Sequence, residues 1–182
     1  GLAATITNDN CNLVKVLAGD LGAKIKGDVV LTSDTGAIVS KEGAFEYVGE
    51  GNITSVTPAA GQAGSLVTIQ GESLFGGGEK AVSVTLAGVT AQIIGSATND
   101  TYLVVKANAG PLSLDKRVGS VVITSDTRVD ITKLEAWSYS VIETVAPAAG
   151  QGGTVVTISG ASLTGDGEDV VKVTLAGIEA SI

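Results

Sequence analysis

The sequence contains no histidine and no methionine, and only 3% of its 182 residues are aromatic. Without histidine, neither a Ser-His-Asp nor a Cys-His catalytic arrangement can be built, and no Cys/His zinc spacing exists. The Gly-rich stretch GGGEK lacks the spaced Gly-Lys-Ser/Thr of a phosphate-binding loop. We therefore expect a protein that is not an enzyme, with no catalytic residues, no cofactor and no metal.

Cysteine occurs once, as Cys11 in the polar run NDNCN, so no disulfide can form within the chain. We expect an incidental thiol, with an intermolecular bond to a partner chain as the alternative. No apolar run reaches the roughly 18 residues that span a bilayer, so direct membrane insertion is not expected in this segment. The chain starts at GLAATI, without an initiator Met or a signal sequence, which indicates a piece of something longer.

Positive charge is also scarce. The chain has 11 Lys and Arg against 19 Asp and Glu, a net charge of −8. Nucleic-acid binding needs clustered basic residues that release counterions from phosphate, and an anionic membrane surface needs them too. We expect no nucleic-acid partner, and we interpret the negative charge as an aid to solubility.

Small apolar residues are what the sequence does have. Hydrophobic residues make up 44% of the chain and are mostly Val, Ile, Leu and Ala, and 25 residues are Gly. That glycine content is about twice the usual share of roughly 7%. β-branched residues with frequent Gly, and no sustained helical period, favour short strands joined by tight turns. The predicted fold class is all-β.

An internal repeat organises the chain. Residues 53–93 align without a gap to 142–182, with 25 of 41 positions identical and an offset of 142 − 53 = 89 residues. Residues 31–48 pair with 123–140 at an offset of 92. A unit of about 89 residues fits a self-contained β-sandwich rather than a short solenoid repeat.

The repeat predicts the domain organisation. Residues 1–51 are the C-terminal half of an immunoglobulin-like repeat, 52–140 a complete repeat, and 141–182 the N-terminal half of the next. Tyr139-Ser140 leads into Val141 without a Pro- or Ser-rich spacer. Neighbouring domains should therefore be closely coupled, as in a semi-rigid string.

Each half repeat needs a complement, because half a sandwich cannot bury its core. Copies of the chain could complement one another head to tail. However, residues 177–182 would then duplicate residues 1–6, which match them in sequence. We therefore prefer the interpretation that the chain is a window of a longer continuous protein.

Alternating apolar residues locate the strands of the complete repeat. Val67 and Ile69 alternate with polar neighbours, and so do Val82, Val84 and Leu86. Pro58 to Gly61 is predicted to be a turn. We expect strands at about 53–57, 65–71, 81–87, 89–95, 101–107, 118–125 and 134–140. Four aromatic residues are expected to pack in the core and at the domain joints: Phe45, Tyr47, Trp137 and Tyr139.

Three sequence motifs recur in register. They are the opening I-x-x-V-x-P-A-A-G-Q-x-G at Ile53 to Gly64, the S/T-x-V-T-I-x-G strand at Ser65 to Gly71, and V-x-V-T-L-A-G at Val82 to Gly88. Ile142 to Gly160 and Val171 to Gly177 repeat them, and an aromatic-x-Tyr closes the repeat. With these features the chain resembles the IPT/TIG family of immunoglobulin-like domains over nearly its whole length. The resemblance implies tandem immunoglobulin-like sandwiches, as in large extracellular surface and fibre proteins.

Few residues are candidates for ligands or modification. Asp166, Glu168 and Asp169 could offer oxygen ligands to Ca²⁺, but we favour a solvated loop. Asn52 and Asn99 each begin an N-x-S/T sequon and are candidates for N-glycosylation in a secreted eukaryotic protein.

We expect a structural extracellular segment of a long stalk or filament core, such as the axis of a cell-surface or flagellar appendage. Its partners would be neighbouring repeats of the same chain, a coat or partner surface protein, and glycans. The alternative is an adhesion module whose loop tips, 75–80 and 164–169, recognise a carbohydrate or a protein. A third possibility, an accessory domain of a starch-acting enzyme, predicts neighbouring catalytic sequence, whereas the flanking halves are further repeats.

Overall fold

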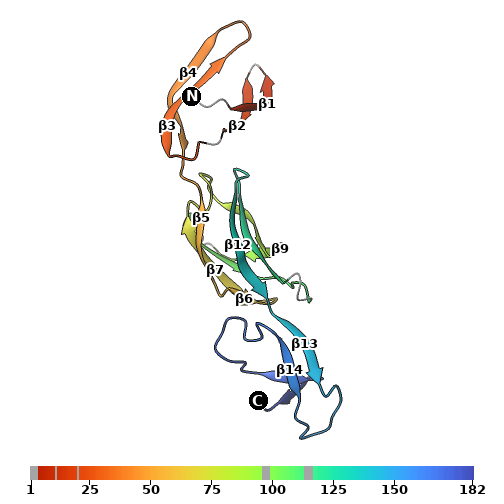
Figure 1. The fold of residues 1–182 in the computed structure, drawn as a ribbon. Helices are drawn as coiled ribbons and strands as arrows, with labels where there is room; N and C mark the ends of the chain where they lie inside the picture. Colours follow the sequence, from red (N-terminus) through yellow and green to blue (C-terminus); the bar gives the residue numbers. More distant parts are fainter. Residues whose placement is uncertain (1–3, 11, 20, 96–98, 113–116) are drawn as a thin grey trace. The chain divides into compact units, whose positions relative to one another are not determined.

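The computed structural model describes residues 4–10, 12–19, 21–95, 99–112 and 117–182. Every regular element within these ranges is a β-strand, which confirms the all-β prediction. None of these residues forms a helix that is long and apolar enough to cross a membrane. The chain divides into two compact units, Gly1–Glu50 and Gly51–Ile182 (Figure 1).

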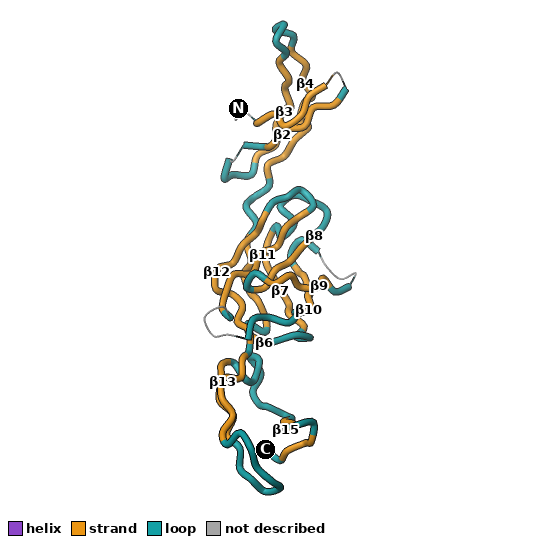
Figure 2. Tube along the Cα trace, turned by 90° about the vertical axis from the view of Figure 1, so that its right-hand side faces the viewer, coloured by secondary structure: helices purple, strands orange, loops and turns teal. Residues whose placement is uncertain are grey.

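Eight strands of the second unit form one hydrogen-bonded sheet that folds over into a sandwich (Figure 2). Their order across the sheet is β5-β7-β10-β9-β8-β11-β12-β6. β9 is bonded to β10 on one side and to β8 on the other, so it joins the two layers. The strands are β5 (Asn52–Thr57), β6 (Ala60–Gly61), β7 (Leu66–Glu72), β8 (Ala81–Leu86), β9 (Val89–Ile93), β10 (Tyr102–Lys106), β11 (Val118–Ser125) and β12 (Asp130–Tyr139).

The core of this sandwich is built from alternate positions of its strands. Val67 and Ile69 of β7 are fully buried, as the alternation predicts, while Thr68 and Gln70 are not. Other strands contribute further fully buried side chains: Val84, Leu86, Leu103, Val105, Val121 and Ile123. Trp137 and Tyr139 of β12 are buried in the same cluster, which confirms their predicted core role.

The predicted turn at Pro58 to Gly61 is correct for Pro58 and Ala59, where the backbone bends, and wrong for Ala60 and Gly61. Ala60 and Gly61 form β6, which pairs in parallel with the end of β12. Pro58 follows β5, and beyond it the chain passes to the other layer, where the Ser138 amide donates to the Ala59 carbonyl oxygen at 2.9 Å. A two-residue strand of small residues has no alternation that the sequence could reveal.

Two details of the predicted strands also differ. The last strand begins at Asp130 instead of about residue 134, because β12 pairs with β11 as far as the hairpin turn. Val82 is 53% exposed, although it was expected on the inner face with Val84. A register irregularity between β8 and β11 lies next to it, and Ala81 packs against the core instead.

The first unit consists of two antiparallel hairpins. They are β1 (Thr5–Asn10) with β2 (Leu13–Leu17), and β3 (Ile25–Thr32) with β4 (Ile38–Tyr47). Phe45 packs edge-to-face on Tyr47, with ring centroids 5.0 Å apart. Phe45 is nevertheless 46% exposed, so it is not buried in a core within this unit, and its packing at a domain joint stays a prediction. In the described part of this unit each sheet has only two strands, so no three-stranded layer comparable to β5-β7-β10 covers the β3–β4 hairpin.

The second unit continues beyond the sandwich in two further hairpins. β13 (Val141–Ala146) pairs with β14 (Thr157–Ala161), and β15 (Val173–Leu175) pairs with β16 (Ile178–Ala180). The β13–β14 ladder has a register irregularity after Ile142, and the β5–β7 ladder has one at the corresponding Ile53.

The hairpins β3–β4 and β11–β12 share one turn design. In the first, the Ala37 amide donates to the Ser33 Oγ at 3.1 Å. In the second, the Val129 amide donates to the Ser125 Oγ at 3.2 Å. These residues correspond at the offset of 92 found in the sequence, and the Ser-Asp-Thr shared by residues 33–35 and 125–127 adopts the same local geometry in both turns.

Candidate functional site at the Ser140 joint

Ser140 is the single residue between β12, which ends at Tyr139, and β13, which begins at Val141. Its amide donates to the Gly61 carbonyl oxygen of β6 at 2.7 Å. Its Oγ donates to the Ser162 carbonyl oxygen at 2.7 Å, on the C-terminal side. Val141, which follows Ser140, is also buried. The connection from β12 to β13 is therefore held by hydrogen bonds at Ser140 and by packing at Val141.

Gln62 adds a second tie. Its Nε2 donates to the Ser140 carbonyl oxygen at 3.0 Å, while its Oε1 accepts from the Gly110 amide at 2.9 Å. One side chain thereby bridges the start of the joint and the loop after β10. A part-buried side-chain amide whose nitrogen and oxygen both bond to backbone groups holds the backbone more firmly than an amide bonded to water would.

The loop at residues 162–167 contacts the sandwich from the C-terminal side. The Asp166 Oδ2 accepts from the Ala59 amide at 2.8 Å, a bond between residues 107 positions apart. Arg117 Nη1 donates to the Ser138 Oγ and lies 3.5 Å from the Ser162 Oγ. We call this set of contacts, at Ser138–Val141 with segments 59–62 and 162–166, the Ser140 joint.

Asp166 was expected in a solvated loop, and the residue is exposed. Its carboxylate also accepts a hydrogen bond from a backbone amide across the joint, which was not expected. Within the described ranges no three His, Cys, Asp or Glu side chains gather so that they could hold a metal ion.

The family model for the IPT/TIG domain matches residues 52–135, from β5 into β12. This segment is an IPT/TIG domain. The match agrees with the sandwich of strands and with the buried core described above, and it confirms the resemblance seen in the sequence motifs.

Three solved structures are similar to about half of the chain. Two are auxiliary nutrient binding proteins, from Bacteroides ovatus (18% identity, TM-score 0.36, 52% of this chain and 22% of that one) and Bacteroides thetaiotaomicron (15%, 0.36, 50% and 21%). The third, also from Bacteroides thetaiotaomicron, is provisionally assigned as a phosphatase (26%, 0.38, 51% and 18%). The chain thus spans about a fifth of the length of each. No curated protein matches it.

The structure places both sequon asparagines at the surface of the IPT/TIG domain. Asn52 is the exposed first residue of β5. Asn99 is exposed beside β10, where its Oδ1 accepts from both the amide and the Oγ1 of Thr101 at 2.9 Å. The two residues belong to different strands and turns, and glycosylation at either one stays a prediction. Cys11 lies outside the described residues.

The aromatic pair of β12 lies beneath the joint. Trp137 and Tyr139 meet edge-to-face with centroids 5.6 Å apart. Within the described residues, neither the Trp137 Nε1 nor the Tyr139 hydroxyl has a hydrogen-bond partner. Burial raises the pKa of the Tyr139 hydroxyl above its usual value of 10.0, with a smaller opposing effect from the Trp137 side chain.

Sequence reasoning did not identify Gln62, Ser140 or Asp166 as joint residues. A signal was present for Gln62, since the motif PAAGQ recurs with Gln151 in the second copy. For Asp166 there was none, because the corresponding residue of the IPT/TIG domain is Gly77.

Proposed function

We propose that this chain is a non-catalytic structural segment in which immunoglobulin-like IPT/TIG domains run in series as part of an extracellular stalk or filament core. The observation that carries the proposal is the Ser140 joint. Only one residue separates β12 from β13, and it is hydrogen-bonded to Gly61 and Ser162. A flexible string of independent binding domains would instead need a polar or Gly/Ser-rich linker.

The composition supports the same proposal. The chain has no histidine for acid–base or nucleophilic catalysis near neutral pH. Its net charge of −8 favours solubility of a long apolar-rich polymer over attraction to nucleic acid or to anionic lipid. Lateral partners would then be a coat or surface protein, or glycans, reached through exposed strand edges.

Recognition through the loop tips is the competing proposal, and it has less support. Within the tip at 75–80, all of which the structure describes, the one aromatic residue is Phe75. It is 5% exposed and belongs to the core. Binding hot spots usually rely on exposed aromatic or Arg anchors, and this tip has neither.

Electron microscopy of the native parent material tests the proposal. A domain of about 89 residues has a radius of gyration of about 12 Å, so each should add roughly 30–45 Å of length. We expect a fibre with that axial period, or twice that for a two-domain unit. Compact particles without any linear array would refute the scaffold role, and glycan-array binding by the IPT/TIG domain would then favour the competing proposal.

A further inference from the structure

The chain has two joints between repeats, and they differ in length. Val48 and Ser140 correspond at the offset of 92, whereas Ile53 and Ile142, which follow them, correspond at the offset of 89. The first joint is therefore longer by 92 − 89 = 3 residues. The additional residues are Gly49, Glu50 and Gly51. Two glycines in three residues give this spacer more backbone freedom than other residue types would.

The side chains that hold the Ser140 joint are replaced at the corresponding positions one repeat earlier. The Ser140 Oγ donates to the Ser162 carbonyl oxygen. The Asp166 Oδ2 accepts from the Ala59 amide. The replacements are Val48 for Ser140, Asn52 for Val141, Gly77 for Asp166 and Ile25 for Arg117. None of them offers a hydroxyl, a carboxylate or a guanidinium, so the same residues cannot repeat these bonds at the first joint.

Gly49 and Glu50 are the residues of the first joint with the fewest restraints. Both lie outside the strands, Glu50 is exposed, and a Cβ built on Gly49 would meet nothing within 4 Å. Gly51 differs, because a Cβ there would fall on the Ile131 side chain and on the Ser73 carbonyl oxygen. Gly51 is thus packed against the IPT/TIG domain. The division between the two compact units falls at the same place, between Glu50 and Gly51.

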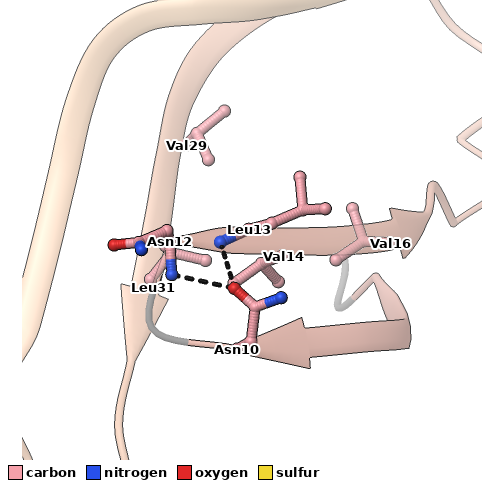
Figure 3. Close-up of a pocket in the computed structure, with 7 residues that line it drawn as sticks. All are labelled: Asn10, Asn12, Leu13, Val14, Val16, Val29 and Leu31. Carbon is pink, nitrogen blue, oxygen red and sulfur yellow. Dashed lines mark hydrogen bonds between the residues drawn. The ribbon is translucent and has the colours of Figure 1, made fainter.

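The two hairpins of the first unit meet on the N-terminal side of this spacer. Side chains of both hairpins line one apolar groove (Figure 3), namely Val14 and Val16 from β2 and Val29 and Leu31 from β3. β4, the partner of β3, ends two residues before Gly49. A rotation about the backbone of Gly49 is therefore transmitted directly to the β3–β4 hairpin.

We propose that the chain has a pivot at Gly49-Glu50, while the Ser140 joint holds the IPT/TIG domain and the strands after it as one body. A glycine without close neighbours changes its backbone dihedrals at little cost. A change at Ser140 instead breaks hydrogen bonds to Gly61 and Ser162. A three-residue spacer spans at most about 10 Å, so the pivot allows rotation but little extension. The inference rests on the composition and contacts of the two joints and does not depend on an extracellular scaffold role.

Distances between pairs of spin labels in the full chain, measured by double electron–electron resonance, test the proposal. Labels on Ser40→Cys and Thr90→Cys span the pivot, and labels on Thr90→Cys and Thr157→Cys span the Ser140 joint. All three labelled positions are exposed. Cys11→Ser removes the single native thiol. Trp137, the single tryptophan, reports through its emission whether the IPT/TIG domain is folded in every variant.

Three variants exchange the properties of the two joints. Gly49→Pro combined with Glu50→Pro stiffens the pivot at constant length, because proline fixes φ. Gly49→Ser combined with Glu50→Ser is the matched control, which keeps the length and leaves both residues free to rotate. Insertion of Gly-Glu-Gly between Ser140 and Val141 gives the second joint the length of the first.

We expect the distance distribution across the pivot to be about twice as broad as the one across Ser140. The double proline variant should narrow it to the width found across Ser140, and the double serine variant should leave it broad. The insertion after Ser140 should broaden the distribution across the second joint by about the same factor of two.

Three results would each overturn the proposal. The first is an equal width across the two joints when neither joint is altered. The second is a distribution that stays broad in the double proline variant, which would place the movement inside the first unit instead of at Gly49-Glu50. The third is an insertion after Ser140 that leaves the second joint narrow, because a Gly-Glu-Gly spacer would then not be the source of the freedom.

Discussion

Gly110 stands against the ring of Tyr139, and this contact depends on the absence of a side chain. A Cβ built on Gly110 would fall on the Cγ, Cδ1 and Cε1 atoms of the ring. The ring itself is fully buried and packs on Trp137, so it has no room to yield.

Gly110→Ala should therefore destabilise the IPT/TIG domain by about 1–3 kcal/mol, the usual cost of overpacking a core. Chemical denaturation followed by Trp137 emission measures the change. Gly152→Ala is the matched control, because a Cβ there meets nothing within 4 Å. Equal stability of Gly110→Ala and the wild type would show that the loop after β10 can move away from the ring.

Tyr139 makes the stability of the domain depend on pH in the alkaline range. The unfolded tyrosine ionises near its usual pKa of 10.0, while burial raises the pKa of the folded one. The unfolded state therefore loses its proton first. The contribution of Tyr139 to the free energy of unfolding is complete below about pH 10. It is lost as pH rises beyond that value, by at most about 1.4 kcal/mol per pH unit.

Tyr139→Phe should remove the part of the loss of stability at alkaline pH that arises from ionisation of Tyr139. At neutral pH it should leave stability unchanged or raise it by about 1 kcal/mol, because it deletes a buried hydroxyl without a hydrogen-bond partner. Urea unfolding at pH 7 and at pH 11 provides both comparisons. Tyr102→Phe retains Tyr139 and should keep the alkaline loss, and an unchanged loss in Tyr139→Phe would contradict the assignment.

At the scale of the element, β12 has a three-residue bulge opposite β11, and β4 has a bulge of the same kind opposite β3. Gly119 pairs with Trp137 and Val121 pairs with Lys133, so three residues of β12 bulge out opposite Ser120. Glu135 lies in this bulge at a φ of 49°, and the corresponding position of β4 is Gly43, at 55°. The bulge requires left-handed backbone, which glycine adopts freely and other residues adopt at a cost.

Glu135→Gly should consequently be tolerated, with a change in stability of less than about 1 kcal/mol. Glu135→Val should cost about 1–2 kcal/mol, because a β-branched side chain fits poorly at positive φ. Thermal unfolding of the two variants gives the comparison. A valine variant as stable as the glycine variant would mean that the bulge relaxes to another backbone conformation.

Strand positions and the core of the IPT/TIG domain could be predicted, because Val67 and Ile69 alternate with polar neighbours and a period of two fixes the buried face. The bulge next to Val82 reversed that alternation locally, and one apolar residue was misplaced. β6 was missed because two small residues have no period. The bond from Asp166 to Ala59 joins residues 107 positions apart, and no local pattern encodes such a distance.

At the scale of the molecule, the Ser140 joint decides whether the IPT/TIG domain and the strands after it act together. Asp166→Ala removes the acceptor for the Ala59 amide. The bond is exposed to solvent, so we expect its loss to cost about 1 kcal/mol and to speed hydrogen exchange at the Ala59 amide by about fivefold. Glu168→Ala, in the same loop, is the control, and unchanged exchange in Asp166→Ala would show that the carboxylate does not hold the joint.

The parallel pairing of β6 with β12 also determines how the domain bears tension. A pull along the chain enters through β5 and β6 and leaves through β12. Because β6 and β12 run in the same direction, it shears their bonds together instead of opening them one by one. The bonds from Ser138 to Ala59 and from Ser140 to Gly61, 2.9 and 2.7 Å long, bracket this two-residue strand. The force at which the IPT/TIG domain yields should therefore be set by this short pair of strands, while its large apolar core governs only how stable it is at rest.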